Sequence, residues 1–279
     1  MKLLKVAFAL IVCVPLSGQE LKIDKKETLW DNFKYDMGNV IGGIGYSYSR
    51  PFHWKGNDWA NFGYMTAGTL ALFTVDDELD EWADGFRDDV PDFLVDYGNE
   101  YGSPENNYML TGGVYLAGLF TKNEKLRRTG VLLIASATAG GFFQQVSKRI
   151  IGRARPKSGE SSSTYDPFNL NRVFNFDSFP SGHAMLAFTN AYAIAKQFKS
   201  PWVKAGIYTV GLIPGFARIT DRFHWVSDVA FSTVLSIFIV ESIDRYLDSK
   251  YDKKYNHQQK KLSWNLNFGP GTMGVAVQF

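Results

Sequence analysis

Three short polar segments, each at the end or the start of an apolar helical run, constrain the fold of this chain more than any other feature. They are residues 148–156 (Lys-Arg-Ile-Ile-Gly-Arg-Ala-Arg-Pro), 180–183 (Pro-Ser-Gly-His) and 218–228 (Arg-Ile-Thr-Asp-Arg-Phe-His-Trp-Val-Ser-Asp). Apolar patterning predicts helices over residues 59–75, 107–120, 125–149, 183–198, 201–217 and 224–251. Polar turns between such helices suit an all-α helical bundle whose loops at one end form the site.

The third segment pairs a histidine with a carboxylate at helical spacing. His224 and Asp228 are four residues apart, which places them on one helix face, one turn from each other. The carboxylate can then accept the Nδ1 proton of the imidazole, which leaves Nε2 free as a nucleophile. Arg218 lies six residues before His224 and is expected to face the same pocket across a turn. The alternative is a surface His–Asp pair beside a solvated arginine.

The second segment predicts the start of a helix. Ser181 and Gly182 place free main-chain N–H groups at a helix N-terminus, where anions bind readily. His183 follows directly, although the whole chain contains only 4 histidines. A plain turn and helix cap would look the same in sequence, so this segment gains its weight from the other two.

The first segment concentrates positive charge. Lys148 lies near the end of an apolar helix and Arg155 just beyond it, before Pro156, which stops a helix. Taken alone, the cluster could be cations on a helix C-terminus or a basic collar beside a membrane. With Arg218 and two histidines it becomes a set that can hold a tetrahedral oxyanion and transfer a phosphoryl group. Residues 157–179 have no regular pattern, and we expect them to form a loop over the site.

In this order the three segments resemble the signature of the type 2 phosphatidic acid phosphatase superfamily. That superfamily includes lipid phosphatases, bacterial class A acid phosphatases, glucose-6-phosphatase and vanadium haloperoxidases. Its pattern is Lys-x6-Arg-Pro, then Pro-Ser-Gly-His, then Ser-Arg-x5-His-x3-Asp, and the chain departs from it only at Ala217, where the pattern has serine. The resemblance covers roughly residues 60–245 and implies the helical bundle of that superfamily.

The resemblance also implies a role for each matching residue. His183 would be the general acid, His224 the nucleophile and Asp228 the partner that orients it. The substrate phosphate would be held by Lys148, Arg155, Ser181, Gly182 and Arg218. Ala217 puts one hydroxyl contact near Arg218 in doubt and leaves the chemistry intact. The pattern implies no metal and no cofactor.

The function implied is metal-independent hydrolysis of phosphomonoesters through a phosphohistidine intermediate. The substrate would be a lipid-linked phosphate or pyrophosphate, or a small phosphomonoester. Two alternatives from the same resemblance are a vanadate-dependent haloperoxidase and a soluble non-specific acid phosphatase. A third is a scaffold or outer-membrane protein that retains an inactive phosphatase domain, against which the complete set of His183, His224 and Asp228 argues.

The two ends of the chain differ from its middle. Residues 1–18 match a secretory signal, with two lysines, an apolar run and small residues after it, and they include the single cysteine, Cys13. Apolar alternation on both sides of Gly-Pro-Gly predicts a small C-terminal β-hairpin, with Val40–Ser49 as a possible partner strand. The predicted organisation is a signal peptide (1–18), an N-terminal segment (19–58), a helical phosphatase domain (59–251), and a linker with the hairpin (252–279).

Charge gives little support to a nucleic-acid partner. Without the signal, the chain would contain 28 Lys and Arg against 28 Asp and Glu, so it is close to neutral. Residues 76–100 hold 11 acidic side chains, which we interpret as short solvated helices rather than a calcium site.

Membrane association is expected from the apolar helices. Only residues 129–147 run uncharged for nearly the length of a membrane span, and glycines and glutamines interrupt them. The protein is therefore expected to be exported, and to be periplasmic or membrane-associated, with its active site on the non-cytoplasmic side.

Overall fold

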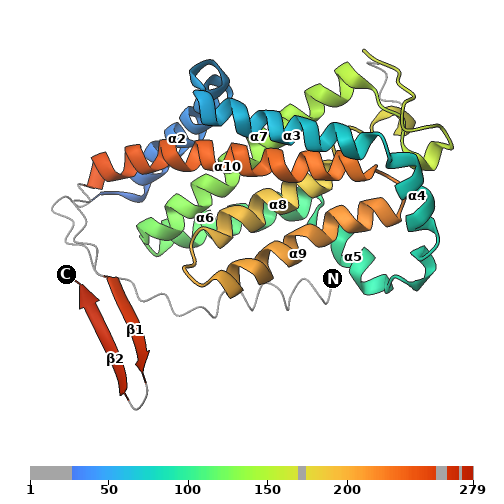
Figure 1. The fold of residues 1–279 in the computed structure, drawn as a ribbon. Helices are drawn as coiled ribbons and strands as arrows, with labels where there is room; N and C mark the ends of the chain where they lie inside the picture. Colours follow the sequence, from blue (N-terminus) through green and yellow to red (C-terminus); the bar gives the residue numbers. More distant parts are fainter. Residues whose placement is uncertain (1–26, 169–173, 256–262, 270–271, 279) are drawn as a thin grey trace.

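The computed structural model describes residues 27–168, 174–255, 263–269 and 272–278 (Figure 1). The α-helices are α2 (Leu29–Ser49), α3 (Gly56–Phe73), α4 (Asp76–Asp84), α5 (Asp92–Tyr101), α6 (Pro104–Phe120), α7 (Glu124–Ile151), α8 (Gly182–Ala195), α9 (Pro201–Thr220) and α10 (Val226–Tyr255). Short 3-10 turns are η1 (Arg50–His53), η2 (Arg87–Asp89), η3 (Pro156–Ser158) and η4 (Phe174–Phe176). These elements confirm the prediction of an all-α domain.

Local capping sets the bounds of the helices. Ser103 begins α6 by accepting a hydrogen bond from the main chain of Asn106, and Ser200 does the same for α9. Proline follows each of these serines at the first helical position, where its missing N–H costs nothing. The predicted helix 224–251 starts later than expected, at Val226, because His224 lies in the turn before it.

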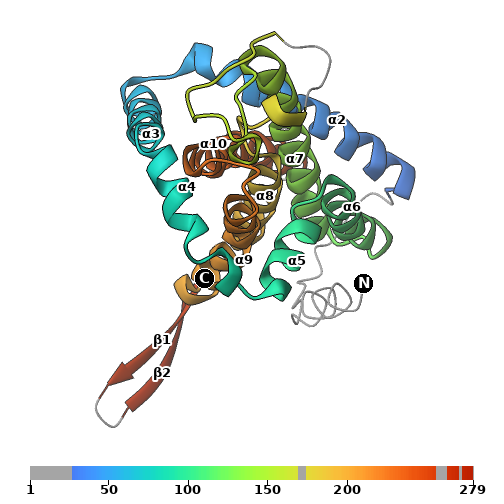
Figure 2. The same cartoon turned by 90° about the vertical axis from the view of Figure 1, so that its right-hand side faces the viewer.

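The bundle is organised around α8, which packs against α7, α9 and α10. Figure 2, which looks along the helices, shows α8 between these three. In Figure 1 the short helices α4 and α5 and the loop between α7 and α8 gather at one end of the bundle. That end is where α7 and α9 finish and where α8 and α10 begin.

The core lies between α7 and α10. Val131, Leu132 and Leu133 of α7 have no exposed surface, and neither do Val240 and Ile243 of α10. Burying one such side chain contributes about 1.5–3 kcal/mol. These contacts hold the two longest helices of the site in a fixed relation.

The prediction of a strand at Val40–Ser49 is wrong, because these residues form the second half of α2. A capping box between Thr28 and Asp31 begins this helix. The glycines that suggested a strand serve close helix packing instead, since a Cβ at Gly42 would collide with Tyr246 of α10.

The acidic stretch forms short helices as predicted, but part of it is not solvated. Asp76 and Asp80 of α4 are 1% and 7% exposed. They form ion pairs with Arg153 and Arg222, which lie far away in the sequence. Burial of these carboxylates follows from partners that the local pattern does not reveal.

The chain ends in the predicted hairpin. Strand β1 (Ser263–Gly269) pairs antiparallel with β2 (Thr272–Gln278), and the register places Trp264 opposite Val277. The predicted signal peptide at 1–18 lies outside the described residues, as does most of the predicted linker. The boundaries of the predicted domains stay predictions.

One helix in the described ranges, α10, is long and apolar enough to cross a membrane by length and composition. About 44% of its most apolar stretch is buried inside the protein. A core helix of a water-soluble bundle has the same properties.

A buried ion pair ties four helices together at the end of the bundle opposite the loops. Asp36 of α2 has no exposed surface and accepts hydrogen bonds from Arg127 Nε (2.9 Å), Tyr115 Oη (3.2 Å) and Tyr251 Oη (2.6 Å). The arginine and the tyrosines come from α7, α6 and α10. Removal of one partner from such a pair leaves an uncompensated buried charge.

We predict that Asp36→Ala lowers the free energy of unfolding by about 3–5 kcal/mol, because it strands the Arg127 guanidinium in the core. Asp248→Ala is the matched control: Asp248 also pairs with an arginine of α7, Arg128, but its side chain is 61% exposed. Asp248→Ala should lower the free energy of unfolding by less than about 1 kcal/mol. Urea unfolding followed by tryptophan fluorescence measures both, and equal losses would contradict the prediction.

Candidate active site

The three polar segments meet at one end of the bundle, where four helix ends converge (Figure 1). Lys148 lies in the last turn of α7, and Arg218 lies in the last turn of α9. Gly182 begins α8, and Asp228 lies in the first turn of α10. This end therefore holds all of the residues singled out in the sequence: Lys148, Arg155, Ser181, Gly182, His183, Arg218, His224 and Asp228.

A glycine turns the chain out of α7 into the site. Gly152 ends the helix with φ 59°, in the left-handed region that favours glycine. A Cβ at this position would collide with the main-chain carbonyl of Asp166. Glycine is therefore required here if Arg153 and Arg155 are to leave the helix in an extended conformation.

The loop predicted to cover the site supplies main-chain partners to this extended stretch. Ala154 N donates to Thr164 O (2.9 Å), and Arg155 N donates to Asn175 O (2.8 Å). Trp225 Nε1 donates to Ala154 O (2.7 Å), which ties the first segment to the third. The position of Arg155 is thus fixed by residues on both sides of it.

Three cations lie in this region without a carboxylate partner. Lys148 and Arg155 are each 8% exposed, and neither they nor Arg218 form an ion pair with any described residue. The buried Nε atoms of Arg155 and Arg218 have no hydrogen-bond partner among the described residues. Burial, with a contribution from Arg155, lowers the pKa of Lys148 to about 7. Burial also lowers the pKa of Arg155 to about 10.

Aromatic rings take the place of carboxylates around these cations. The Phe223 ring lies 5.5 Å from the Arg155 guanidinium and 4.9 Å from that of Arg218. Phe174, at the edge of the site, lies 4.1 Å from Arg155. A ring face attracts a cation without neutralising it. The guanidinium groups are therefore held in place and keep their charge available for an anion.

The start of α8 offers further donors. Ser181 is the N-cap residue of α8, is fully buried, and has no partner for its Oγ among the described residues. The first N–H groups of a helix lack intrahelical acceptors and carry partial positive charge. A Cβ at Gly182 would lie 2.9 Å from the Gln144 side chain. The small residue lets the start of α8 pack against α7.

His183 contacts one of the three cations directly. Its Nε2 accepts a hydrogen bond from Arg218 Nη2. Burial and the neighbouring charge of Arg218 lower the pKa of His183 to about 3, so the imidazole is neutral in this state. The ring is also confined from the side of α5, because a Cβ at Gly102 would lie 2.8 Å from the His183 Cβ.

The hydrogen bond expected between His224 and Asp228 is replaced by a different one. Nδ1 of His224 lies 2.6 Å from the main-chain carbonyl of Ser178 and 3.8 Å from Asp228 Oδ2. Since a carbonyl only accepts, Nδ1 carries the proton and Nε2 keeps its lone pair. The tautomer expected from the sequence is the one present, but a main-chain oxygen holds it. Burial lowers the pKa of His224 to about 3.

Asp228 is held by other donors. Its Oδ1 accepts from Arg153 Nη1 (2.6 Å), and its Oδ2 accepts from Ser178 Oγ (2.5 Å) and Trp225 N (3.0 Å). Burial alone would raise the pKa of this carboxyl, but contacts with His224 and Arg153 outweigh burial and the pKa lies below its usual value. Asp228 therefore stays ionised beneath the imidazole.

Arg153 and Asp76 were not singled out in the sequence. Arg153 is 2% exposed and bridges Asp228 to Asp76 of α4. The only sequence signal for Arg153 is its place in the basic segment 148–156, two residues before Arg155. Nothing in the sequence pointed to Asp76 as its partner.

Ala217, the one departure from the signature, lies against α5. It is 1% exposed, and a Cβ at Gly98 of α5 would lie 2.5 Å from the Ala217 Cβ. This position is therefore part of the α5–α9 helix contact. The serine hydroxyl of the pattern would therefore lie in the packed contact between α5 and α9.

Comparisons with known proteins agree with the resemblance seen in the sequence. The model of the PAP2 superfamily matches residues 129–247, which contain all three segments, so the resemblance is confirmed. The chain is similar in structure to one described as the first transmembrane PAP2 type phosphatidylglycerolphosphate phosphatase from Bacillus subtilis. That similarity has a TM-score of 0.46 and 17% identity, and it covers 72% of this chain and 97% of the other. No curated protein sequence matches the chain.

We predict that anion binding at this site weakens as the pH rises through the pKa of Lys148, about 7. Below this pH the ammonium is charged and attracts an anion, whereas above it the buried amine is neutral. Sulfate is a suitable probe because its own charge does not change between about pH 6 and 9. Its dissociation constant should rise by up to about tenfold per pH unit above 7.

Lys148→Arg is the control for this titration, because a guanidinium stays charged throughout the range. The variant should show a smaller pH dependence than the wild type, measured by isothermal titration calorimetry, because only His183 can still take up a proton when the anion binds. A flat wild-type profile, or the same slope in the variant, would contradict the assignment of the titration to Lys148.

Proposed function

We propose that this protein is a phosphatase that hydrolyses lipid-linked phosphomonoesters through a phosphohistidine formed on His224. The observation that carries the proposal is a histidine whose Nε2 keeps its lone pair, close to three cations that form no ion pair with any described residue. Lys148, Arg155 and Arg218 supply the charge that a phosphoryl group needs. The match of residues 129–247 to the PAP2 superfamily supports the same reaction class.

In the first step the lone pair on His224 Nε2 forms a bond to phosphorus. The ester P–O bond breaks, its electron pair goes to the leaving oxygen, and His183 donates a proton to that oxygen. In the second step a water oxygen attacks phosphorus while His183 takes the proton from the water. The P–N bond then breaks, and its electron pair returns to Nε2.

The contacts of His183 indicate what substrate binding has to change. His183 is neutral, with Nε2 occupied by a hydrogen bond from Arg218. A phosphate dianion competes for Arg218 and places negative charge beside the imidazole. Both effects raise the pKa of His183. Substrate binding therefore converts His183 from an acceptor into the acid that the leaving group needs.

The charge of the site supports metal independence, since Lys148, Arg155 and Arg218 all lie near enough to lower the pKa of His183. A haloperoxidase using bound vanadate is the rival from another reaction class. Vanadate would occupy the same cradle, so halide oxidation by the vanadate-loaded protein decides between the two. Release of phosphate from the apo protein supports the phosphatase.

Exposed apolar side chains on several helices favour a lipid-linked substrate and a protein associated with a membrane. On α3, Tyr64 is 77% exposed and Leu70 is 59% exposed. On α9, Trp202 is 85% exposed, and α6 ends in Phe120 at 68%. Large exposed apolar surfaces mark sites of interaction with another protein or with a bilayer. A soluble non-specific phosphatase would leave these faces in water.

The signal-like residues 1–18 are the basis for a proposal about location. We propose that the protein is exported and that its active site lies on the non-cytoplasmic side.

We predict that the wild-type protein, incubated with labelled phosphate ester in EDTA, forms an acid-labile and alkali-stable phosphoenzyme, as expected for phosphohistidine. His224→Ala should form none and should lose turnover, because the variant lacks the imidazole nitrogen that forms the bond to phosphorus. His53→Ala is the matched control, since His53 is exposed on η1. A strict requirement for Mg²⁺, or normal phosphoenzyme in His224→Ala, would contradict the proposal.

The substrate class is tested in the same assay. Phosphatidic acid, phosphatidylglycerol phosphate, polyprenyl pyrophosphate, a lipid A phosphate and a small soluble ester are compared by phosphate release. Faster turnover of the lipid esters at equal concentration supports a lipid-linked substrate, and faster turnover of the soluble ester supports the non-specific acid phosphatase.

We predict that His183→Ala slows hydrolysis of alkyl phosphates by about 10²–10⁴, because an alkoxide leaves poorly without a proton. Nitrophenolate leaves readily unprotonated, so the pre-steady-state burst of nitrophenol should be slowed much less. Steady-state turnover is a poor measure here, because His183 also acts in the second step. A burst that falls as far as the alkyl rate would make His183 a binding residue instead.

A further inference from the structure

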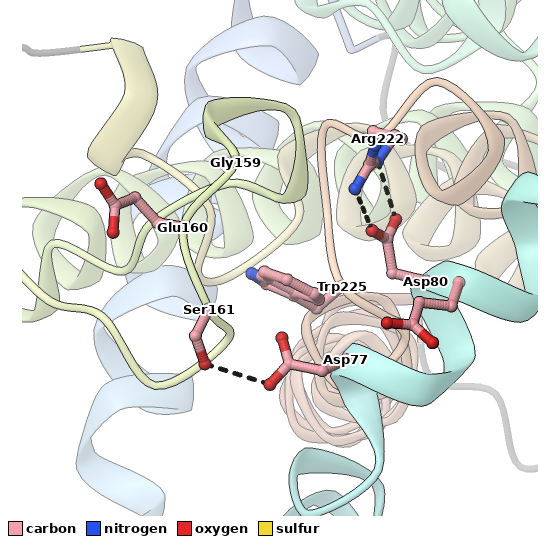
Figure 3. Close-up of a pocket in the computed structure, with 8 residues that line it drawn as sticks. Asp77, Asp80, Gly159, Glu160, Ser161, Arg222 and Trp225 are labelled. Atoms are coloured by element: carbon pink, nitrogen blue, oxygen red, sulfur yellow. Dashed lines mark hydrogen bonds and ion pairs between the residues drawn. The ribbon is translucent and has the colours of Figure 1, made fainter.

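Helix α4 lies outside the three segments, yet three of its carboxylates reach loops of the site. Asp80 pairs with Arg222, two residues before His224, and Asp77 accepts from Ser161 Oγ at 3.1 Å. Figure 3 shows both contacts, around a hollow of about 250 Å³. The third carboxylate, Asp76, reaches deepest and is 1% exposed.

Asp76 connects α4 to the start of α10. Its Oδ1 accepts from the main-chain N–H of Ser227 (3.0 Å), and its Oδ2 accepts from Ser227 Oγ. Ser227 lies in the first turn of α10, where N–H groups lack intrahelical acceptors. A carboxylate at this place also interacts favourably with the helix dipole. Asp76 therefore caps, from another helix, the element that directly follows His224.

Asp76 also fixes the Arg153 guanidinium. Arg153 Nη2 donates to Asp76 Oδ2 (2.8 Å), while Arg153 Nε donates to Ser162 O (2.8 Å). The rings of Phe73 and Trp225 lie 4.7 Å and 5.4 Å from the guanidinium. With these contacts in place, Nη1 is aimed at Asp228 Oδ1, at 2.6 Å.

The chain of contacts ends at His224. Because Oδ1 of Asp228 is held by Arg153, Oδ2 is turned toward Ser178 Oγ and toward His224. Ser178 in turn supplies the carbonyl that holds the Nδ1 proton of His224. A rotation of the Asp228 carboxylate would therefore move both groups that orient the imidazole.

We propose that Asp76 is a positioning residue for the nucleophile: through Arg153 and Asp228, and through its cap on α10, it fixes the orientation and tautomer of His224. The nucleophilic role of His224 belongs to the proposed function, on which this inference rests. Asp76 touches none of the three cations, so it has no direct part in holding the phosphate.

Asp76→Asn tests the inference, because the amide keeps the size of the side chain and removes its charge. We expect phosphoenzyme formation to slow by about 10–100-fold, which is the loss typical of residues that orient a metal ligand through a hydrogen bond without touching the metal. Sulfate affinity should change by less than about twofold, because Lys148, Arg155 and Arg218 are untouched. A loss of sulfate affinity in parallel with the rate would indicate general disruption and overturn the inference.

Asp77→Asn is the matched control. It removes the same charge from the neighbouring position of α4, where the contacts are to Ser161 and Ser162 and not to Arg153. Its rate should stay within about threefold of the wild-type rate. If Asp76→Asn slows phosphoenzyme formation no more than this control, the inference fails.

A readout without turnover separates this inference from the proposed function. Ring ¹⁵N NMR reports the tautomer of His224, and only 4 histidines contribute, so His224→Gln assigns its signals. The wild type should show protonated Nδ1, and Asp76→Asn should show a mixture of tautomers. This result stands even if the wild type hydrolyses no phosphate ester, in which case only the proposed function fails. Unchanged His224 signals in Asp76→Asn would overturn the inference.

Arg153→Lys replaces Asp76→Asn if the latter does not fold. The lysine keeps the charge but cannot contact Asp76, Asp228 and Ser162 together. We expect the same change of tautomer, and an unchanged His224 spectrum in this variant would equally overturn the inference.

Discussion

The structure depends on holding three like charges close together before any ligand arrives. Lys148, Arg155 and Arg218 repel one another, and burial raises the cost of keeping each of them charged. The protein tolerates this because aromatic faces, rather than carboxylates, lie against the guanidinium groups. Carboxylates at these places would occupy the cations and exclude an incoming anion. A bound anion would offset both the mutual repulsion and part of the cost of burial.

Negative charge is present, but one layer further out. Asp228 lies beneath the imidazole of His224, and Asp76 lies beneath Asp228, with Arg153 between the two carboxylates. The layer that would touch a substrate is cationic, and the layer that supports it is mixed. This arrangement separates two tasks, since the first layer binds charge and the second fixes orientation. The antiparallel bundle makes it possible by bringing four helix ends to one place.

Most of the helices could be predicted from the sequence, because periodicity is a local property. The sequence also predicted that loops at one end of the bundle form the site, whereas the roles of the individual residues stay predictions. The prediction of a strand at Val40–Ser49 is wrong because Gly42 and Gly43 lie in a helix that packs closely against α10, a contact that the local pattern does not reveal. Asp76 could not be predicted as a partner of Arg153, since 77 residues separate them and an acidic helix usually faces water. The hydrogen bond from His224 Nδ1 to the main-chain carbonyl of Ser178 could not be predicted either. Every residue has a main-chain carbonyl, so the identity of residue 178 does not indicate this contact.

The contact between Gly98 and Ala217 links the one position that departs from the superfamily pattern to a residue that the pattern does not include. The two backbones approach so closely that Gly98 has no room for a methyl group, and Pro214 Cα lies 3.2 Å from where its Cβ would be. A serine at position 217 would put an additional oxygen into the same interface. The identities at the two positions are therefore expected to covary across related sequences, with the serine of the pattern found where α5 lies farther away.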